Sequence, residues 1–207
     1  MSNIAFEKVS YETFISSIKC TAHIYNSDIK DTLLYDLWDN IKLPKRSTAG
    51  SAGYDFFLPF ELSLSQGQSV VIPTGIKCKL PMDKVLMLYP RSGLGFKHRL
   101  MLSNTIPVID ADYYNNEDNE GHIMIKLYYA GHDDGNIEWK LGISSNGNSH
   151  KVFYTPVTKE VLEDKNRTIY LASGKAFAQG VILDYYTTDD DNTDGVRIGG
   201  LGSTDKK

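Results

Sequence analysis

An apolar, β-branched run that ends in two carboxylates is the most informative pattern in the chain. Residues 104–114 read Asn-Thr-Ile-Pro-Val-Ile-Asp-Ala-Asp-Tyr-Tyr, and a turn-rich stretch over 115–121 follows. Residues 123–128 then alternate between apolar and polar side chains. An apolar run, a polar turn and an alternating run together predict a β-hairpin. In an extended strand, Asp110 and Asp112 would point to the same face, because successive side chains alternate.

Two carboxylates on one face near the end of a hairpin have several possible uses. Such a pair can hold a metal, activate a water molecule or share a proton. Asp and Asn also stabilise turns by bonding to their own backbone, which requires no chemistry at all. The pair alone leaves these alternatives open, so the decision rests on the other segments of the chain.

The remaining hydrophobic pattern predicts mostly strands. Residues 11–25 have the β-branched and aromatic content of a strand, whereas residues 31–38 could form a short helix capped by Asp31. A continuous apolar strand over 85–89 runs into a polar turn, and residues 168–183 read as strand, turn and strand. We therefore expect an all-β fold with minor helical content.

Length and composition indicate one globular domain. The chain has 207 residues, of which 41% are hydrophobic and 23% charged, enough to bury a sizeable core. A net charge of −4 argues against broad nucleic-acid binding, which needs a basic face. Two cysteines are too few for a disulfide framework, and the five histidines lack the spacing of a metal site. Without a signal-peptide or membrane-helix pattern, we expect a cytoplasmic protein with no membrane partner.

A strand followed by cationic and small residues predicts an anion site. Arg91, Ser92 and Gly93 follow the apolar strand, and a guanidinium, a hydroxyl and backbone N–H groups can converge on phosphate oxygens. Small residues also crowd around Asp55, where a backbone can pack closely or approach a ligand. Gln179 lies inside an apolar run, so its amide must bond either within the core or to a ligand.

Two segments differ in composition from the rest. Residues 131–167 carry clusters of turn residues around short strand-like pieces, which is typical of an insertion displayed from a β scaffold. This insertion is either a tolerated surface elaboration or an arm that binds a partner protein. Residues 189–207 form an acidic and then glycine-rich tail, which either frays or wraps around an anion.

Five segments in a fixed order resemble the five motifs of the homotrimeric dUTPase family. They are residues 52–55, 90–95, 104–113, 174–179 and 197–204. Each segment alone is a weak signal, but five in order are specific. The resemblance leaves residues 1–40 as an N-terminal extension of a single dUTPase-like domain that spans residues 1–207.

The resemblance implies a jelly-roll-like (β-clip) subunit, a homotrimer with active sites at subunit junctions, and hydrolysis of dUTP to dUMP and diphosphate with Mg²⁺. Asp110 would activate the water that attacks the α-phosphate. Asp55 would lie near the water shell of the metal without binding the ion directly. The residues implied to bind the substrate are Arg91, Ser92, Gly93, Asn104, Ile109, Tyr113, Gln179, Arg197, Leu201, Gly202, Ser203 and Thr204.

The same resemblance assigns parts of the substrate to these residues. Tyr113 would pack against the deoxyribose and exclude a 2′-hydroxyl, and the strand around Asn104 would read the edge of uracil. Residues 91–93 would hold phosphates, with Gln179 beside them. Arg197, with Ser203 and Thr204, would close over the terminal phosphate from a neighbouring subunit.

Several residues depart from the pattern of the family. Leu201 stands where the family has a Phe over the uracil ring, and leucine covers a base without stacking on it. Pro107 occupies a position that is usually Gly, and Lys175-Ala176 replaces Asp-Arg in the fourth motif. Residues 115–120 lengthen the hairpin expected after the third motif.

Three other functions compete with dUTP hydrolysis. A related dCTP deaminase carries a Glu in the strand after the third motif, whereas residues 122–127 contain none. A regulatory protein would capture a partner through the 131–167 insertion, with hydrolysis secondary or absent. A purely structural jelly-roll subunit would leave Arg91, Asp110 and Arg197 unexplained together.

Overall fold

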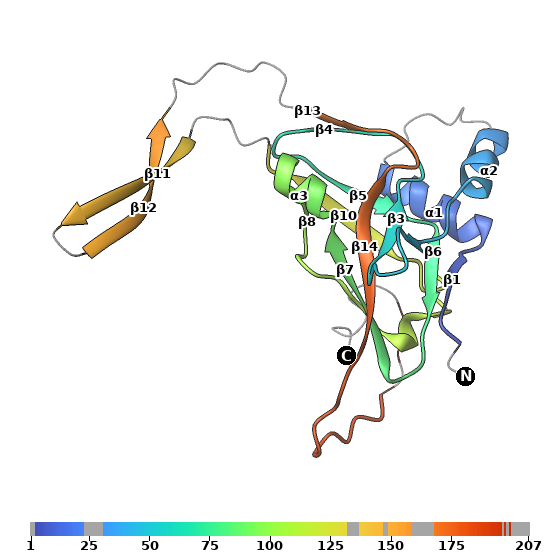
Figure 1. The fold of residues 1–207 in the computed structure, drawn as a ribbon. Coiled ribbons are helices and arrows are strands. Elements are labelled where there is room, and N and C mark those ends of the chain that lie inside the picture. Colours follow the sequence, from blue (N-terminus) through green and yellow to red (C-terminus); the bar gives the residue numbers. More distant parts are fainter. Residues whose placement is uncertain are drawn as a thin grey trace.

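The computed structural model describes residues 3–22, 31–131, 137–146, 149–158, 168–195, 197 and 199. This part of the chain is mostly β-strand with a few helices (Figure 1). The strands are β1 (Ala5–Lys8), β2 (Lys45–Arg46), β3 (Tyr54–Phe57), β4 (Leu62–Ser65), β5 (Ser69–Pro73), β6 (Ile76–Lys79), β7 (Lys84–Pro90), β8 (Leu100–Leu102), β9 (Val108–Ile109), β10 (Met124–Tyr129), β11 (Ile137–Asn146), β12 (Ser149–Thr158), β13 (Thr168–Leu171) and β14 (Ala176–Asp184). The helices are α1 (Tyr11–Ala22), α2 (Asp31–Asp39), α3 (Ser92–His98) and the 3-10 helix η1 (Ala111–Tyr113).

The largest sheet carries Asp55, Ile109 and Gln179, and Arg91 and Asp110 directly follow two of its strands. Its strand order is β2-β3-β14-β7-β9, with antiparallel pairing between neighbours. At its centre, Gly180 on β14 lies close to side chains of its neighbours, and a Cβ there would lie 2.7 Å from a methyl group of Leu86 on β7. The register places Gln179 opposite Asp55 on β3 and Tyr89 on β7.

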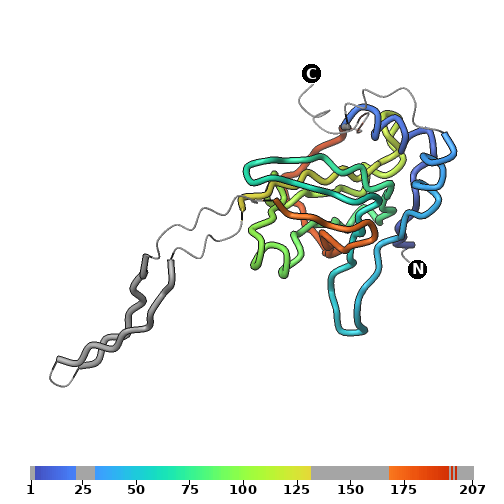
Figure 2. The backbone as a smooth tube through the Cα atoms, turned by 90° about the horizontal axis from the view of Figure 1, so that it is seen from above, coloured from blue at the N-terminus to red at the C-terminus, as the bar shows by residue number. Residues whose placement is uncertain are grey.

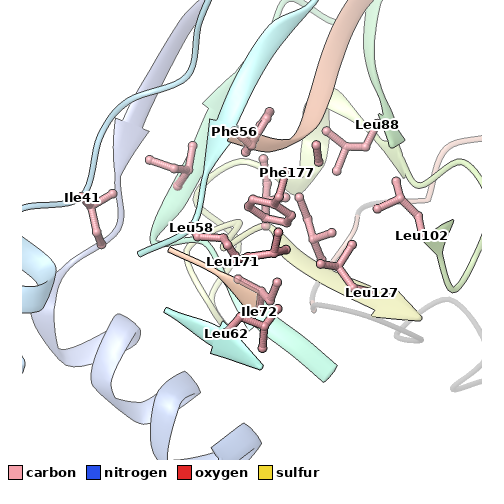
Figure 3. Close-up of a cluster of buried hydrophobic side chains, with 14 of the residues drawn as sticks. Ile41, Phe56, Leu58, Leu62, Ile72, Leu88, Leu102, Leu127, Leu171 and Phe177 are labelled. Atoms are coloured by element: carbon pink, nitrogen blue, oxygen red, sulfur yellow. The ribbon is translucent and has the colours of Figure 1, made fainter. Parts of the chain in front are cut away.

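The smaller sheets close the hydrophobic core. A three-stranded sheet has the order β5-β10-β8, and the pairs β1-β6 and β13-β4 lie beside it in the fold. Side chains from several of these strands gather in one cluster that includes Phe56, Ile72, Leu88, Leu127 and Phe177 (Figure 3). Each of these side chains is almost fully buried, and such burial stabilises a fold by about 1.5–3 kcal/mol per large apolar side chain.

Residues 11–22 of the N-terminal extension form helix α1, so the strand predicted over residues 11–25 is wrong there, and residues 23–25 lie outside the described residues. Phe14, Ile15 and Ile18 fall on one face of α1 and are buried, which is a helical period that the β-branched character of the two isoleucines obscures. Ser10 caps the helix, because its Oγ accepts a hydrogen bond from the backbone N–H of Thr13 at 3.2 Å. Figure 2 shows this segment and α2 along one side of the strands.

The helix predicted over residues 31–38 is confirmed as α2. Leu34 faces the core and is buried. Leu33 is 63% exposed, so the apolar stripe is narrower than the sequence indicates. Two turns of helix with one buried leucine rely on packing against α1, because short isolated helices are marginal in water.

The hairpin predicted over residues 104–128 is wrong. Its first strand, β9, pairs with β7, and β10 pairs instead with β5 and β8. Between them runs a loop of residues 113–122, which we call the tyrosine loop. Its shape comes from local bonds, since Asn116 Oδ1 accepts from the N–H groups of Asp118 and Asn119 at 3.0 and 3.1 Å.

The insertion contributes an antiparallel pair of strands, β11 and β12, with Ile137 opposite Thr158. The remaining residues of the insertion that lie outside the described part are 132–136, 147–148 and 159–167. No helix in the described part of the chain is both long and apolar enough to cross a membrane.

Candidate active site

Arg91 directly follows β7 and is held by a buried carboxylate. Its Nη1 donates to Asp55 Oδ2 at 2.8 Å, and Ser47 Oγ donates to the same oxygen at 2.7 Å. Asp55 is only 8% exposed, whereas the Arg91 side chain is 38% exposed. A guanidinium has five donors, so this pairing fixes its direction and leaves donors for a ligand. Residues 92–98 form α3 instead of the predicted turn.

Gln179 lies on β14 beside this ion pair. Its Nε2 is 3.5 Å from the carbonyl oxygen of Pro90, to which it donates a weak hydrogen bond. Its Oε1 explains the small residues near Asp55, because a Cβ at Gly53 would lie only 2.6 Å from that oxygen. The Gln179 amide is half-buried and lies near Arg91. It packs against the backbone at Gly53, in the segment of small residues that the sequence predicts to pack closely or approach a ligand.

A cleft of about 380 Å³ opens beside Arg91. We call it the cationic cleft, because its charged lining residues are Arg91, Lys97 and Lys175 and include no carboxylate. The other lining residues are Gly93, Leu94, His98, Gly174 and Ala176. Ser92 is exposed as the first residue of α3. Lys97 and Lys175, together with the part of the Arg91 charge that Asp55 does not neutralise, produce a local potential that attracts an anion, despite the net negative charge of the chain.

Asp110 and Asp112 lie elsewhere and do not share the face of a strand, so that expectation is wrong. Strand β9 ends at Ile109, and η1 places Asp112 within a helical turn. The two carboxylates nevertheless meet at Arg197, whose Nη2 is 3.3 Å from Asp110 and whose Nη1 is 3.6 Å from Asp112. Both carboxylate side chains are about half exposed, at 51% and 45%.

Tyr113 completes this group, which we call the carboxylate cluster (Asp110, Asp112, Tyr113 and Arg197). The guanidinium carbon of Arg197 is 5.3 Å from the centre of the Tyr113 ring, within cation–π range. The phenol is buried, donates to the carbonyl of His122 at 2.9 Å and accepts from Asn119 Nδ2 at 2.8 Å. Burial raises the pKa of Tyr113, so the ring stays neutral at physiological pH.

The cationic cleft and the carboxylate cluster do not converge within one chain. Ile109 pairs with Leu86 near the start of β7, whereas Arg91 follows the end of the same strand. Figure 1 shows α3 beyond the arrowhead of β7. At about 3.3 Å per residue, about 20 Å of strand separates the Asp110 end from Arg91. One chain therefore cannot bring Asp110 and Arg91 to the same phosphorus atom.

The other predicted site residues divide into two groups. Asn104 is exposed in a turn between β8 and β9, so the predicted strand around it is wrong; its carbonyl accepts from Thr105 Oγ1 and Ile106 N. Ile109 is half-buried on β9. Four predicted residues lie outside the described part of the chain: Leu201, Gly202, Ser203 and Thr204.

Sequence reasoning missed three polar residues that support the site. Ser47 shares the Asp55 carboxylate with Arg91, and nothing in the sequence pairs a serine with that position. Glu120 and His122 lie in or beside a stretch rich in turn residues, whose composition predicts only local hydrogen bonds and gives no sign of their long-range contacts. Glu120 bonds to Ser10, 110 positions away. The available signal was a histidine at position 122, directly before the alternating run of residues 123–128.

No group of three or more His, Cys, Asp or Glu in the described residues could hold a metal ion. The Oδ2 atom of Asp55 already accepts hydrogen bonds from Arg91 and Ser47, so this oxygen is not available to coordinate a metal ion directly. Mg²⁺ usually keeps several waters and binds through substrate phosphates plus one or two carboxylates. The site therefore fits an Mg²⁺ that arrives with a polyphosphate and does not fit a permanent protein cage.

Comparison with known proteins identifies the family. A family model described as dUTPase matches residues 39–141. A deoxyuridine 5′-triphosphate nucleotidohydrolase from Lactococcus lactis is 46% identical over 42% of this chain, and the match spans 58% of that relative. The corresponding enzyme from Chlamydia pneumoniae is 35% identical over 67% of this chain and 88% of its own length. The chain belongs to the dUTPase family.

Solved dUTPases agree with the fold. The crystal structure of dUTPase from Streptococcus mutans matches with a TM-score of 0.54 and 28% identity, over 89% of this chain and 98% of that one. A dUTPase from a phage of S. aureus, described with a species-specific insert, matches with a TM-score of 0.54 at 18% identity, over 93% of this chain and 97% of that one. The mostly-β dUTPase fold with few helices is therefore confirmed.

Proposed function

We propose that this protein hydrolyses dUTP to dUMP and diphosphate, the reaction of the family to which it belongs, and that Asp110 delivers the attacking water. Family membership supports the reaction, and the exposed carboxylate next to an arginine supports the role of Asp110. A carboxylate in this position can accept a proton from water while cationic groups neutralise phosphate oxygens. The attack would fall on the α-phosphate, with diphosphate as the leaving group.

The cationic cleft would hold the triphosphate. Arg91, oriented by Asp55, would donate to phosphate oxygens together with Ser92 and the backbone at Gly93. Gln179 lies beside this group and would contact the same phosphates. When Mg²⁺ is bound, it would neutralise charge on the phosphate oxygens, with Asp55 reached through a water molecule.

The carboxylate cluster would hold the nucleoside. Tyr113 would pack against the deoxyribose, where a 2′-hydroxyl would meet the ring, and Asn104 and Ile109 would contact the uracil. The guanidinium of Arg197 lies over the ring of Tyr113. Substrate binding would therefore displace Arg197 from the ring and free its guanidinium for the terminal phosphate. Tail residues Leu201, Gly202, Ser203 and Thr204 would close over the substrate with it.

A homotrimer of jelly-roll-like subunits would unite the two parts of the site. About 20 Å of β7 separates them in one chain, at about 3.3 Å per residue, so the cleft of one subunit must meet the cluster of another. Exposed apolar residues beside the site support burial against a second copy, since Ile106 and Val108 are 43% and 53% exposed. The site is incomplete without that copy.

The test of the catalytic role is Asp110→Asn. Asparagine keeps the shape and removes the basic carboxylate, so diphosphate release from dUTP should fall by about 10³-fold or more. Binding of a non-hydrolysable dUTP analogue should persist, and calorimetry measures it. Asp112→Asn is the matched control, because it alters the other carboxylate at Arg197 and should reduce turnover far less. Wild-type rates in Asp110→Asn would refute the mechanism.

The test of the shared site is complementation between inactive variants. Asp110→Asn and Arg91→Ala each remove one part, so each homogeneous protein should be inactive. Subunits of the two, unfolded together and refolded, should recover up to about a quarter of wild-type activity, because random assembly pairs two intact parts in that fraction of junctions. No recovery, with mixed trimers verified by native mass spectrometry, would show that the site is not shared.

A further inference from the structure

Helix α1 belongs to the N-terminal extension, yet it is hydrogen-bonded to the loop that carries Tyr113. The family model matches residues 39–141, so α1 lies outside the residues that this model matches. The tyrosine loop (113–122) contacts α1 at two points, through Glu120 and through His122. Both contacts are hydrogen bonds between particular polar groups. An extra helix could pack on the fold through apolar burial alone, without such bonds.

Glu120 binds the start of α1. Its carboxylate accepts from the backbone N–H of Ser10 at 3.1 Å, from Ser10 Oγ, and from Thr13 Oγ1 at 2.6 Å. Lys77 Nζ adds an ion pair at 3.3 Å. Burial acts to raise the pKa of Glu120, but the hydrogen bonds outweigh it and lower the pKa to about 2. The side chain is therefore a fixed anion that joins the loop to the helix.

His122 binds the middle of α1. The ring is fully buried, and its Nε2 lies 2.8 Å from the backbone N of Gly75, whose N–H donates to it. Burial lowers the pKa of His122 to about 4, so the ring is neutral and its proton lies on Nδ1. Nδ1 then donates to Ser17 Oγ at 3.0 Å, and Ser17 Oγ donates to the carbonyl of Thr13 at 2.9 Å.

The same histidine holds the phenol of Tyr113. The Tyr113 hydroxyl donates to the backbone carbonyl of His122 at 2.9 Å and accepts from Asn119 at 2.8 Å. His122 thus connects α1 to Tyr113, since its ring bonds to the hydroxyl of Ser17 and its backbone carbonyl accepts from the phenol. Movement of α1 would shift the ring that the proposed function places against the sugar.

We propose that α1 is a positioning element for Tyr113, and that Ser17 and Glu120 are positioning residues for recognition of deoxyribose. The proposal rests on the proposed function, because it assigns Tyr113 to the sugar. Neither residue would touch the substrate. Their effect is therefore expected in substrate affinity and in the preference for dUTP over UTP, and not in the chemical step.

Two substitutions on the same helix separate positioning from stability. Ser17→Ala removes a hydroxyl that donates to a carbonyl one turn earlier and also contacts His122. Thr21→Val removes a hydroxyl that donates likewise, to the carbonyl of Ser17 at 2.8 Å, and among the described residues this hydroxyl makes no hydrogen bond to the tyrosine loop. Glu120→Gln is the second test variant, with the anion removed.

We expect Ser17→Ala to raise KM for dUTP by about fivefold, the factor that a single hydrogen bond is worth, with kcat unchanged within twofold. The ratio of kcat/KM for dUTP to that for UTP should fall by a similar factor. Glu120→Gln should act in the same direction, and Thr21→Val should leave both quantities at wild-type values. NMR of ring-labelled tyrosine should show a shifted Tyr113 signal in Ser17→Ala and in Glu120→Gln, and an unshifted one in Thr21→Val.

Unchanged selectivity and an unmoved Tyr113 signal in both Ser17→Ala and Glu120→Gln would overturn the proposal, even if both proteins melt earlier. Equal effects of Ser17→Ala and Thr21→Val would overturn it too, since they would reflect helix stability alone. Failure of the proposed function looks different: the wild-type protein would not hydrolyse dUTP, while the NMR comparison would still report whether α1 positions Tyr113.

Discussion

Replacing Glu120 by glutamine should destabilise the fold at neutral pH, and the loss should disappear in acid. The carboxylate has a pKa of about 2 in the folded protein, against an ordinary value of 4.5. A folded pKa below the unfolded one means that the charged group stabilises the fold above pH 4.5. That stabilisation is lost as the pH falls from about 4.5 towards about 2.

The size of the effect follows from the same shift. Each unit of pKa difference corresponds to about 1.4 kcal/mol, which sets a ceiling of about 3 kcal/mol. The Glu120 side chain is 32% exposed, so solvent screening reduces the expected value to about 2 kcal/mol. Glutamine keeps an amide oxygen that can accept hydrogen bonds, and the comparison therefore isolates the negative charge.

Urea unfolding followed by circular dichroism measures this difference at pH 7, pH 5 and pH 2.5. Glu117→Gln is the matched control, because Glu117 is an exposed residue of the same loop. The gap between the wild-type protein and Glu120→Gln should be full at pH 7 and pH 5 and mostly closed at pH 2.5. A gap of the same size at all three pH values would refute the reasoning, since the loss would then be steric.

Three further predictions test other parts of the protein. Removal of residues 197–207 should lower kcat for dUTP by about 10²-fold or more while the trimer persists, because Arg197 leaves with the tail; steady-state kinetics and sedimentation measure both, and unchanged kinetics would contradict tail closure. Deletion of residues 135–165 should leave dUTP hydrolysis largely intact if the insertion binds a partner; loss of both trimer and activity would make it structural instead. Gly180→Ala should cost about 1–3 kcal/mol in urea unfolding, because the new Cβ would meet Leu86 at 2.7 Å; wild-type stability would show that Leu86 moves aside.

The parts of the fold that follow local periodicity were predictable from the sequence. Strand β7, strand β14 and helix α2 each carry an apolar pattern that specifies the element without reference to its neighbours. Helix α1 was not predictable in the same way, because Ile15 and Ile18 favour a strand by propensity. Its helical period and the cap at Ser10 decide the outcome.

Pairing between remote segments was beyond the sequence. The apolar run before Asp110 suggested a hairpin, but its partner is β7, more than twenty positions earlier in the chain. The sequence predicts Arg91 as an anion ligand, whereas its support by Ser47 and Asp55 depends on the register between strands. The roles proposed for the site residues stay predictions, because the fold of one chain does not determine which residues contact a substrate.

The length of β7 has a consequence for how the enzyme behaves when it is scarce. If the groups at its two ends serve different junctions, an isolated subunit has no complete site. Dilution below the dissociation constant of the assembly would then reduce the specific activity, and the rate would rise more steeply than linearly with protein concentration. A cell that makes little of this protein would have disproportionately little activity.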